Sequence, residues 1–310
     1  MITISDCLVI CVENTLAYNT YKKFGFNVVN PYLYNKRWHY RVRYISQCIS
    51  LENSIVFKPF FRFNKHFLNV KPQKIILIGA LLYEPILSEL KRLYNDTPIF
   101  YLYPNIVDSD ASIHPAILRK YNIIGVSWDK NDCTKYQLKY IRPAFDIDII
   151  RGENTEKVYD ACFIGKDKGR YDLVMKIKNV FLNAGYKPYI RISPDYSFMK
   201  FFKKDYSVPI PYSSYIDIVK ASKCIIDIVQ EGQIGTTMRT MEALFSGKKI
   251  ISNNKYLKDY DFYHPANIFI IEDNLNDIPN FLNIPSVKID EKILDNYKFS
   301  VWIKTLLTLD

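Results

Sequence analysis

Short apolar runs alternate with longer amphipathic stretches almost throughout this chain, and this alternation limits the folds that it can adopt. The run K-I-I-L-I-G from Lys74 to Gly79 is almost entirely apolar, as expected for a strand that is buried on both faces. Residues 170–183 instead have apolar side chains at helical spacing. Strands that alternate with helices in this way predict βαβ units and a parallel sheet.

The same reasoning assigns secondary structure to most of the sequence. We expect strands at residues 7–12, 26–29, 74–79, 99–102, 123–126, 160–164, 189–192, 224–229, 249–252 and 268–271. We expect helices at residues 37–49, 85–93, 170–183, 237–246 and 290–307. A further helix would end at Lys23, and another would begin at a capping box formed by Ser214 and Asp217 and end at Ala221. Residues 129–156 are polar and irregular, so we interpret them as a connection.

This connection separates two halves of similar size, which predicts an α/β protein with two domains. Residues 1–150 and 151–310 would each form a Rossmann-like, doubly wound domain, and a C-terminal helix would close the chain. Two such domains that face each other leave a cleft at the carboxyl ends of their strands, where ligands bind in folds of this kind.

Composition excludes several classes of protein. Hydrophobic residues make up 48% of the 310 residues and aromatic residues 15%, which is enough to build packed cores and excludes a disordered chain. The six cysteines are scattered without a C-x-x-C pair, so we expect buried thiols in a reducing compartment and no metal site. The sequence contains neither a secretory signal nor an apolar run near the ~20 residues of a membrane span, so we expect a cytoplasmic protein.

Positive charge is concentrated in the first half of the chain. Residues 1–150 carry 19 Lys and Arg against 12 Asp and Glu, whereas residues 151–310 carry 23 against 20. Basic and aromatic residues are interleaved over residues 36–44 and again over residues 58–66. Such runs are typical of surfaces that bind nucleic acid, an anionic membrane or a phosphorylated substrate, but also of a solvated helix face.

The segment G-K-D-K-G-R, residues 165–170, lies between a predicted strand and a predicted helix. Backbone amides at the helix start and three cationic side chains would attract an anion, and a diphosphate would suit this loop. The candidate ligands are Gly165, Lys166, Lys168 and Arg170. An ordinary basic surface turn is the alternative interpretation.

A second segment has the same arrangement of strand, glycine-bearing loop and helix. Amides and hydroxyls at its helix start would donate to a phosphate, and Glu242, one turn further on, would accept the hydroxyls of a ribose. The candidates here are Glu231, Gly232, Gly235, Thr236, Thr237, Arg239 and Glu242. The alternative is a surface ion pair between Arg239 and Glu242, with Thr236 as a helix cap.

The run E-G-Q-I-G-T-T-M-R-T-M-E-A-L-F-S-G-K-K-I-I-S, residues 231–252, resembles the donor-site signature of GT-B glycosyltransferases that build bacterial capsule and lipopolysaccharide. Y-D-A-C-F-I-G-K-D-K-G-R, residues 159–170, is similar to the loop that meets the donor diphosphate in that family. The resemblance covers residues 155–275 and implies that Glu242 binds the nucleotide ribose. The first half is similar only in architecture, as an acceptor domain.

This resemblance implies a metal-independent enzyme without a cofactor. Such an enzyme would move a sugar from a nucleotide-sugar donor to a glycan or lipid-linked acceptor, at the inner face of the cytoplasmic membrane and without a nucleic-acid partner. Many retaining members have a second glutamate before the one that matches Glu242, but Ile234 lies eight positions before it and Glu231 is not at the expected spacing. Lys249 also replaces the usual proline before the next strand, so the anomeric outcome stays open.

An inverting reaction would require a general base on the acceptor side. The candidates are Glu13, Asp108, Asp110 and His114, and we prefer Glu13 because it directly follows the first predicted strand. Two other functions compete with glycosyl transfer. One is a sugar-nucleotide epimerase of the same fold, and the other is a non-catalytic protein, either a scaffold or a basic nucleic-acid-binding protein.

Overall fold

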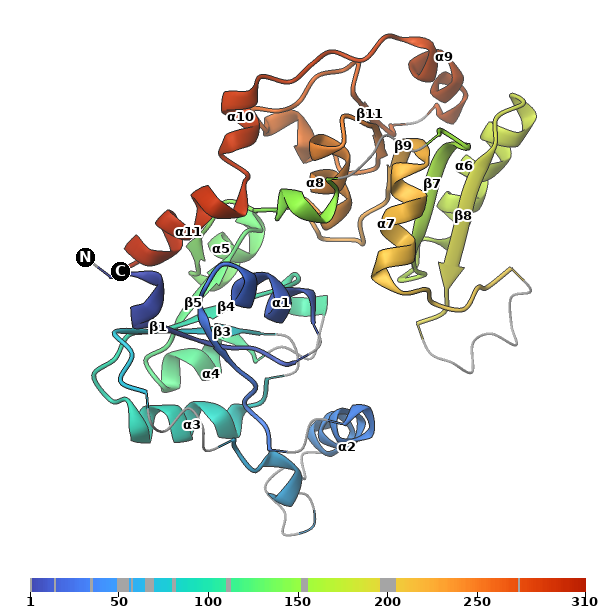
Figure 1. Cartoon of the computed structure of the whole chain (residues 1–310). Helices are drawn as coiled ribbons and strands as arrows, with labels where there is room; N and C mark the ends of the chain where they lie inside the picture. Colours follow the sequence, from blue (N-terminus) through green and yellow to red (C-terminus); the bar gives the residue numbers. More distant parts are fainter. Residues whose placement is uncertain are drawn as a thin grey trace. The chain divides into compact units, whose positions relative to one another are not determined.

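The computed structural model describes the chain except residues 1, 14, 34–35, 49–55, 57, 65–69, 80–81, 110–112, 152–155, 196–204 and 273. The chain folds into two compact units, which are coloured along the sequence in Figure 1. The first unit consists of Met1–Arg142 and Ile303–Asp310, and the second of Pro143–Trp302. The last residues therefore belong to the first unit, whereas the sequence had suggested a simple division near residue 150.

The first unit contains a sheet of six parallel strands in the order β2-β1-β3-β4-β5-β6. The strands are β1 (Cys7–Ile10), β2 (Asn27–Val29), β3 (Lys74–Ile78), β4 (Ile99–Leu102), β5 (Ile124–Ser127) and β6 (Lys139–Tyr140). The helices are α1 (Leu16–Lys23), α2 (Arg37–Cys48), α3 (Glu84–Leu93), α4 (Pro115–Lys120) and α5 (Lys130–Tyr136).

The second unit contains five parallel strands in the order β11-β10-β9-β7-β8. The strands are β7 (Tyr159–Lys166), β8 (Pro188–Ser193), β9 (Ser222–Asp227), β10 (Lys249–Ser252) and β11 (Ile268–Ile270). The helices are α6 (Tyr171–Asn183), α7 (Tyr212–Lys220), α8 (Met238–Phe245), α9 (Ile278–Asn283), α10 (Glu291–Asp295) and α11 (Phe299–Thr308), the last of which continues into the first unit.

Both sheets confirm the predicted α/β class, and both have the same topology. In the first sheet the strand order reverses between β1 and β3, and in the second it reverses between β7 and β9. Ligands of open α/β sheets bind outside the carboxyl ends of the strands at such a switch point. Each unit therefore has one position at which its topology favours a binding site.

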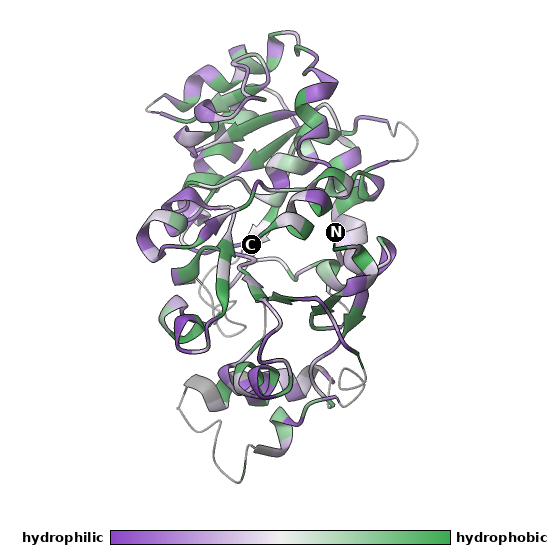
Figure 2. Cartoon of the chain, turned by 90° about the vertical axis from the view of Figure 1, so that its left-hand side faces the viewer, coloured by the Kyte–Doolittle hydropathy of each residue, from purple (hydrophilic) through white to green (hydrophobic). Residues whose placement is uncertain are grey.

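Apolar runs form the strands because both faces of the central strands are covered. Every residue of β1, β3, β4 and β10 is buried, and Figure 2 shows the strands mostly green and the helices striped green and purple. In α8 the buried Met241 and Leu244 belong to the core of the second unit. Burying a side chain of this size contributes about 1.5–3 kcal/mol, so the core holds α8 and the loop before it in place.

Three expectations for the elements are wrong. The predicted connection contains α5 and β6, since Asp129 caps a short helix by accepting from the amides of Asn131 and Asp132. The capping box at Ser214 does not exist, because α7 begins at Tyr212, directly after Pro211. The predicted C-terminal helix is two helices, α10 and α11.

The end of the chain is fixed by a buried lysine. Lys74, at the start of β3, donates from Nζ to the carbonyl oxygens of Leu306, Leu307 and Leu309, at 3.2, 2.8 and 2.6 Å. A cation at these free carbonyls is favourable because the last turn of a helix has negative polarity. Over the described part of the chain, no helix has both the length and the apolar content that a bilayer span requires.

Candidate functional site

The two segments that the sequence singles out meet at the switch point of the second sheet. Residues 165–170 follow β7, and residues 228–237 connect β9 to α8. Because β7 and β9 are neighbouring parallel strands, both segments lie at the carboxyl edge of the sheet, on either side of the point where the strand order reverses.

Gly165 leaves room for two guanidinium groups. A Cβ atom on Gly165 would lie 2.4 Å from Nη2 of Arg239 and 3.5 Å from Nη2 of Arg170. Both guanidinium groups also stand over the ring of Phe163, at 5.1 and 5.5 Å from its centre. Two positive charges therefore converge at the end of β7, where glycine is required by close approach rather than by a turn.

Main-chain oxygens hold the two arginines in place. Arg239 Nη2 donates to the carbonyl of Ile164 at 2.7 Å, and Arg170 Nη1 donates to the carbonyl of Ile228 at 2.7 Å. Burial, together with the charge of Arg239, lowers the pKa of Arg170 to about 10. Since neighbouring like charges in a half-buried site disfavour each other, an anion bound between them would be stabilised.

A buried carboxylate orients Arg239 and the start of α8. Asp227, at the end of β9, is fully buried, and its Oδ1 lies 3.8 Å from Arg239 Nη1. Its Oδ2 accepts from the hydroxyls of Thr237 and Thr240, each at 2.7 Å. Thr237 also caps α8 by accepting from the amide of Thr240, so its hydroxyl serves the structure of the helix start.

Thr236 differs from its neighbour. Its side chain is only 2% exposed, and within the described part of the chain its Oγ1 has no hydrogen-bond partner. A buried hydroxyl without a partner costs roughly 1–3 kcal/mol, and it lies one residue before the N-cap of α8. Of the predicted hydroxyl donors, Thr236 is therefore the one still available to a ligand.

The loop after β7 is already folded around a carboxylate. The amide of Lys168 donates to both oxygens of Asp195, at 3.2 and 3.0 Å. Lys168 and Gly169 have φ values of 44° and 77°, which turn this amide toward Asp195. Lys166 is exposed and Lys168 is half-buried, so their ammonium groups lie at the rim, outside the arginine pair.

The glycine loop before α8 is held by two asparagines that the sequence analysis did not name. Asn254 donates from Nδ2 to the carbonyls of Ile234 and Gly235, at 3.1 Å each. Asn253 accepts from the amide of Val229 at 2.8 Å and donates to its carbonyl at 3.2 Å. Both asparagines directly follow the apolar run of β10. Two polar side chains at this strand exit were the sequence signal that could have identified them. Gly232, with a φ of 80°, lies at the exposed tip of this loop beside the exposed Glu231.

Glu242 lies under a pair of tyrosines. It is 1% exposed; its Oε1 accepts from Tyr212 at 2.7 Å, and its Oε2 accepts from Tyr215. Burial raises the pKa of Glu242, while the two phenols and Arg239 oppose this rise. The alternative of a surface ion pair with Arg239 is wrong, because Arg239 is bound to Ile164 and Asp227 instead. A carboxylate has about four acceptor positions, and the two tyrosines occupy two of them. The other two are left for a ligand that can reach Glu242 past the tyrosines.

The predicted bases of the first unit have different surroundings. Glu13 lies three residues after β1 and is half-buried, next to the switch point of its sheet. Asp108 is bound to Lys135 at 2.8 Å and to the hydroxyl of Tyr136, and these hydrogen bonds lower its pKa. His114 caps α4 by accepting from the amide of Ala116 at 3.3 Å. Asp110 lies outside the described residues.

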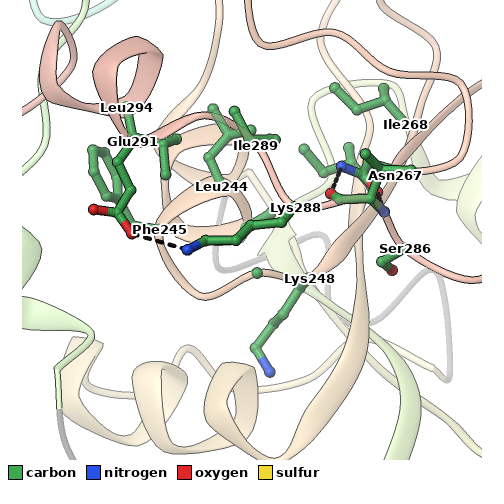
Figure 3. Close-up of a pocket in the computed structure, with 14 residues that line it drawn as sticks. Leu244, Phe245, Lys248, Asn267, Ile268, Ser286, Lys288, Ile289, Glu291 and Leu294 are labelled. Carbon is green, nitrogen blue, oxygen red and sulfur yellow. Dashed lines mark hydrogen bonds and ion pairs between the residues drawn. The ribbon is translucent and has the colours of Figure 1, made fainter.

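A pocket of about 400 Å³ lies at the other edge of the second sheet (Figure 3). It is lined by residues from the end of α8, the starts of β10 and β11, and residues 286–294. Lys288 and Glu291 form an ion pair of 3.0 Å on one side of it, and Asn267 is bonded to the backbone of Val287. Because this is the amino edge of the strands, the pocket is separate from the switch point.

Comparisons with known proteins identify the fold. No protein-family model and no curated protein sequence matches the chain. Sucrose-phosphate synthase from Thermosynechococcus elongatus matches with a TM-score of 0.58 and 7% identity, over 96% of each chain. AviGT4, a glycosyltransferase involved in avilamycin A biosynthesis, matches with a TM-score of 0.54 and 9% identity, over 77% of this chain and 74% of its own.

UDP-GlcNAc 2-epimerase from Methanocaldococcus jannaschii, solved with UDP-GlcNAc and UDP, matches with a TM-score of 0.50 and 10% identity, over 97% of this chain and 99% of its own. The fold of the chain is therefore the GT-B fold that the sequence predicted. Glycosyltransferases and UDP-sugar epimerases both have this fold. The fold therefore does not determine the reaction, which has to be argued from the residues of the site.

Proposed function

We propose that the protein is a glycosyltransferase that moves a sugar from a nucleotide-sugar donor to a glycan or lipid-linked acceptor of a bacterial surface polysaccharide. The observation that carries this proposal is the convergence of Arg170 and Arg239 on Gly165, at the switch point of the second sheet. A nucleoside diphosphate would bring further negative charge to this pair, in which Arg239 already has Asp227 as a counter-charge at 3.8 Å. The buried hydroxyl of Thr236 is a neutral donor at the same edge.

In this proposal the arginines stabilise the leaving group. As the bond between the sugar and the diphosphate breaks, negative charge grows on the diphosphate, and donors fixed beforehand stabilise it without reorganisation. Asp227 and the carbonyls of Ile164 and Ile228 fix Arg239 and Arg170 before the donor arrives. The proposed enzyme therefore needs no metal ion for this task, and added chelator would leave its rate unchanged.

Glu242 is the proposed ribose ligand, and it is covered in the free protein. Tyr212 and Tyr215 occupy one acceptor position on each of its oxygens. Ribose hydroxyls would use the other two after Tyr212 has moved, since Tyr212 is the more exposed of the two tyrosines. Glu13 is the proposed general base if the reaction inverts the anomeric centre.

A thermal-shift panel tests the donor site. UDP-, GDP-, CMP- and dTDP-sugars are added to the wild type, to Arg239→Gln and to the surface control Lys176→Gln on α6. A ligand that binds only the folded state raises the melting temperature by mass action. We expect one nucleotide family to stabilise the wild type and the control but not Arg239→Gln. If no nucleotide stabilises the wild type, the proposal is wrong.

A sugar-nucleotide epimerase is the second candidate, because a UDP-GlcNAc 2-epimerase has the same fold. The two activities differ in their need for an acceptor. An epimerase would convert the stabilising nucleotide sugar to an isomer in the absence of any other substrate. Under the proposed function the sugar moiety of the donor keeps its configuration until it is transferred or hydrolysed, which NMR of the incubated donor would show.

A further inference from the structure

The whole net charge of the protein is contained in one segment of the first unit. Residues 14–83 include 11 Lys and Arg but only one Asp or Glu, Glu52, which gives 11 − 1 = +10. The rest of the chain has 42 − 11 = 31 basic and 32 − 1 = 31 acidic residues, so its net charge is zero. The segment therefore carries a net positive charge that the rest of the chain, taken as a whole, does not have.

Helix α2 lies in this segment, and part of its apolar surface faces outward rather than toward the core. Among its described side chains, His39, Arg43 and Ser46 are buried, at 7%, 0% and 0% exposed. Trp38 and Ile45 are 52% and 55% exposed, and the ring of Trp38 also contacts the rings of His39 and Phe60, at 3.8 and 5.7 Å between centres. Surface helices normally turn their apolar stripe to the core, so an outward apolar stripe indicates that this face meets another apolar phase.

Specific contacts fix this orientation. The Arg43 guanidinium lies 4.0 Å from the ring centre of Tyr32 and 4.4 Å from that of Tyr40, and its Nη1 donates to the carbonyl of Phe60 at 2.6 Å. Phe60 belongs to the 3-10 turn Lys58–Phe61, which packs beside α2 (Figure 1). Rotating α2 to hide Trp38 would expose these contacts, so the outward face is set by the packing beneath it.

The outward face combines two features. Trp38, Arg41 and Ile45 are spaced by three and four residues, so they share one side of the helix, and we call this set the α2 face. Arg41 is exposed between the two apolar side chains, and Lys36 is exposed just before the helix. Tryptophan and arginine side by side are typical of helices that lie in the boundary between lipid headgroups and acyl chains.

We propose that the α2 face binds the surface of an anionic lipid bilayer. The apolar side chains would enter the boundary region while Arg41 and the surrounding positive charge meet lipid phosphates. Single-stranded nucleic acid would also use a basic, aromatic surface, but it stacks its bases on aromatic rings and has no use for an exposed isoleucine. This inference depends on α2 and not on the donor site, so each can fail without the other.

Vesicle co-sedimentation of the full chain tests the proposal. The probes are vesicles of phosphatidylcholine alone and of phosphatidylcholine mixed with phosphatidylglycerol. We expect binding to the mixed vesicles only, and weaker binding at high salt because exposed charges are screened. Arg41→Gln should lower the partition about fivefold, as expected for one cation near an anionic surface. Trp38→Glu combined with Ile45→Glu should abolish binding.

A matched control separates the α2 face from general effects of charge. Leu182, in α6 of the second unit, is 52% exposed, as Trp38 is. Leu182→Glu should bind vesicles like the wild type, and all variants should keep the circular dichroism spectrum of the wild type. Trp38 emission should also shift to the blue with mixed vesicles, and Trp38→Phe should lose that shift.

Three outcomes would overturn the proposal. The first is equal binding to both kinds of vesicle, and the second is equal loss of binding in Leu182→Glu and in the α2 double variant. The third is tight, salt-dependent binding of an oligonucleotide that competes with vesicles and is lost in Arg41→Gln, which would assign the face to nucleic acid.

Discussion

The two switch points of this molecule have the same strand order but different side chains. In the first unit the reversal lies between β1 and β3 and is followed by Glu13, a carboxylate. In the second it lies between β7 and β9 and is followed by two arginines that converge on Gly165. One topology thus offers a place for a proton acceptor in one unit and a place for an anion in the other.

This comparison separates what a fold supplies from what residues supply. A parallel sheet with a reversed strand order provides a crevice at its carboxyl edge, whatever its sequence. The charge in that crevice is decided by a few positions, and at β7 it depends on the absence of a side chain at Gly165. If the two switch points have the roles proposed for them, substitutions in one should alter catalysis alone, and substitutions in the other should alter donor binding.

The largest effect is expected for Glu13→Gln. Removing a general base lowers turnover by about 10²–10⁴-fold, while the donor affinity should stay unchanged because the donor is assigned to the other unit. The rate of nucleotide release from the donor that stabilises the wild type gives the turnover, and thermal shift gives the affinity.

Asp108→Asn is the matched control for this prediction. Asp108 is occupied by Lys135 and Tyr136, so it should contribute little to the reaction. A large loss of turnover in Asp108→Asn with none in Glu13→Gln would move the base to the region of Asp108. A change in donor affinity in Glu13→Gln would contradict the division of roles.

The next effect is expected for Arg239→Gln. Loss of one fixed donor to a developing charge costs roughly 10²–10³-fold in rate, and the affinity for the diphosphate should fall as well. The variant should also be less stable, because Asp227 would lose its nearest cation while fully buried. Arg239→Lys keeps the positive charge, but its single nitrogen cannot contact Ile164 and Asp227 at the same time. Compared with Arg239→Gln, it should therefore recover more of the stability than of the activity.

Much of the fold could be predicted because buried parallel strands have a strong pattern. The residues 75–78 of β3 are all apolar, and Ile250 and Ile251 of β10 place apolar side chains on both faces of that strand. The break between α10 and α11 had no local signal. There, the amide of Phe145 donates to Tyr297 at 2.8 Å, and the amide of Phe299 donates to Phe145 at 2.9 Å, and such a long-range pairing cannot be inferred from one sequence.

The candidate site could be predicted in position but not in detail. Glycines after two apolar runs marked the loops that lie at the switch point, because strand exits with close backbone approach require glycine. The partners of those loops come from other strands: Asp195 follows β8, and Asn253 and Asn254 follow β10. Which hydroxyl caps a helix and which stays free also depends on Asp227, so Thr236 and Thr237 could not be distinguished beforehand.

Gly165→Ala should have a smaller effect than loss of Arg239. The new methyl group would lie 2.4 Å from the far end of the Arg239 side chain, which can move aside by giving up its hydrogen bond to Ile164, so the free energy of unfolding should fall by about 1 kcal/mol. The displaced guanidinium should lower donor affinity about tenfold, the equivalent of 1.4 kcal/mol. Isothermal titration calorimetry would measure it.

Gly185→Ala provides the opposite control. Gly185 has a φ of 78°, and no atom lies within 4 Å of the position that a Cβ atom would take, so its substitution strains the backbone away from the site without a steric clash. It should lower the free energy of unfolding by about 1 kcal/mol and leave donor affinity unchanged. If both variants lose affinity equally, the loss reflects stability and not the space for Arg239.

The smallest effects concern the pH dependence of stability, which should have opposite signs in the two units. Burial raises the pKa of Glu242, so folding favours its protonated form, and its contribution to stability is lost as pH rises above about 4.3. Hydrogen bonds from Lys135 and Tyr136 lower the pKa of Asp108, so its contribution is present above about 3.9 and is lost as pH falls.

Urea unfolding at several pH values measures both slopes. Relative to Glu242→Gln, the wild type should lose stability as pH rises through the acid range, whereas relative to Asp108→Asn it should gain stability. The Asp108 difference should be the smaller, because that pair is half exposed and screened by water. The absence of a slope for Glu242 would show that it is solvated in solution, and its place beneath Tyr212 and Tyr215 would then be wrong. A slope of the same sign as that of Asp108 would show that the hydrogen bonds from the two tyrosines outweigh the effect of burial.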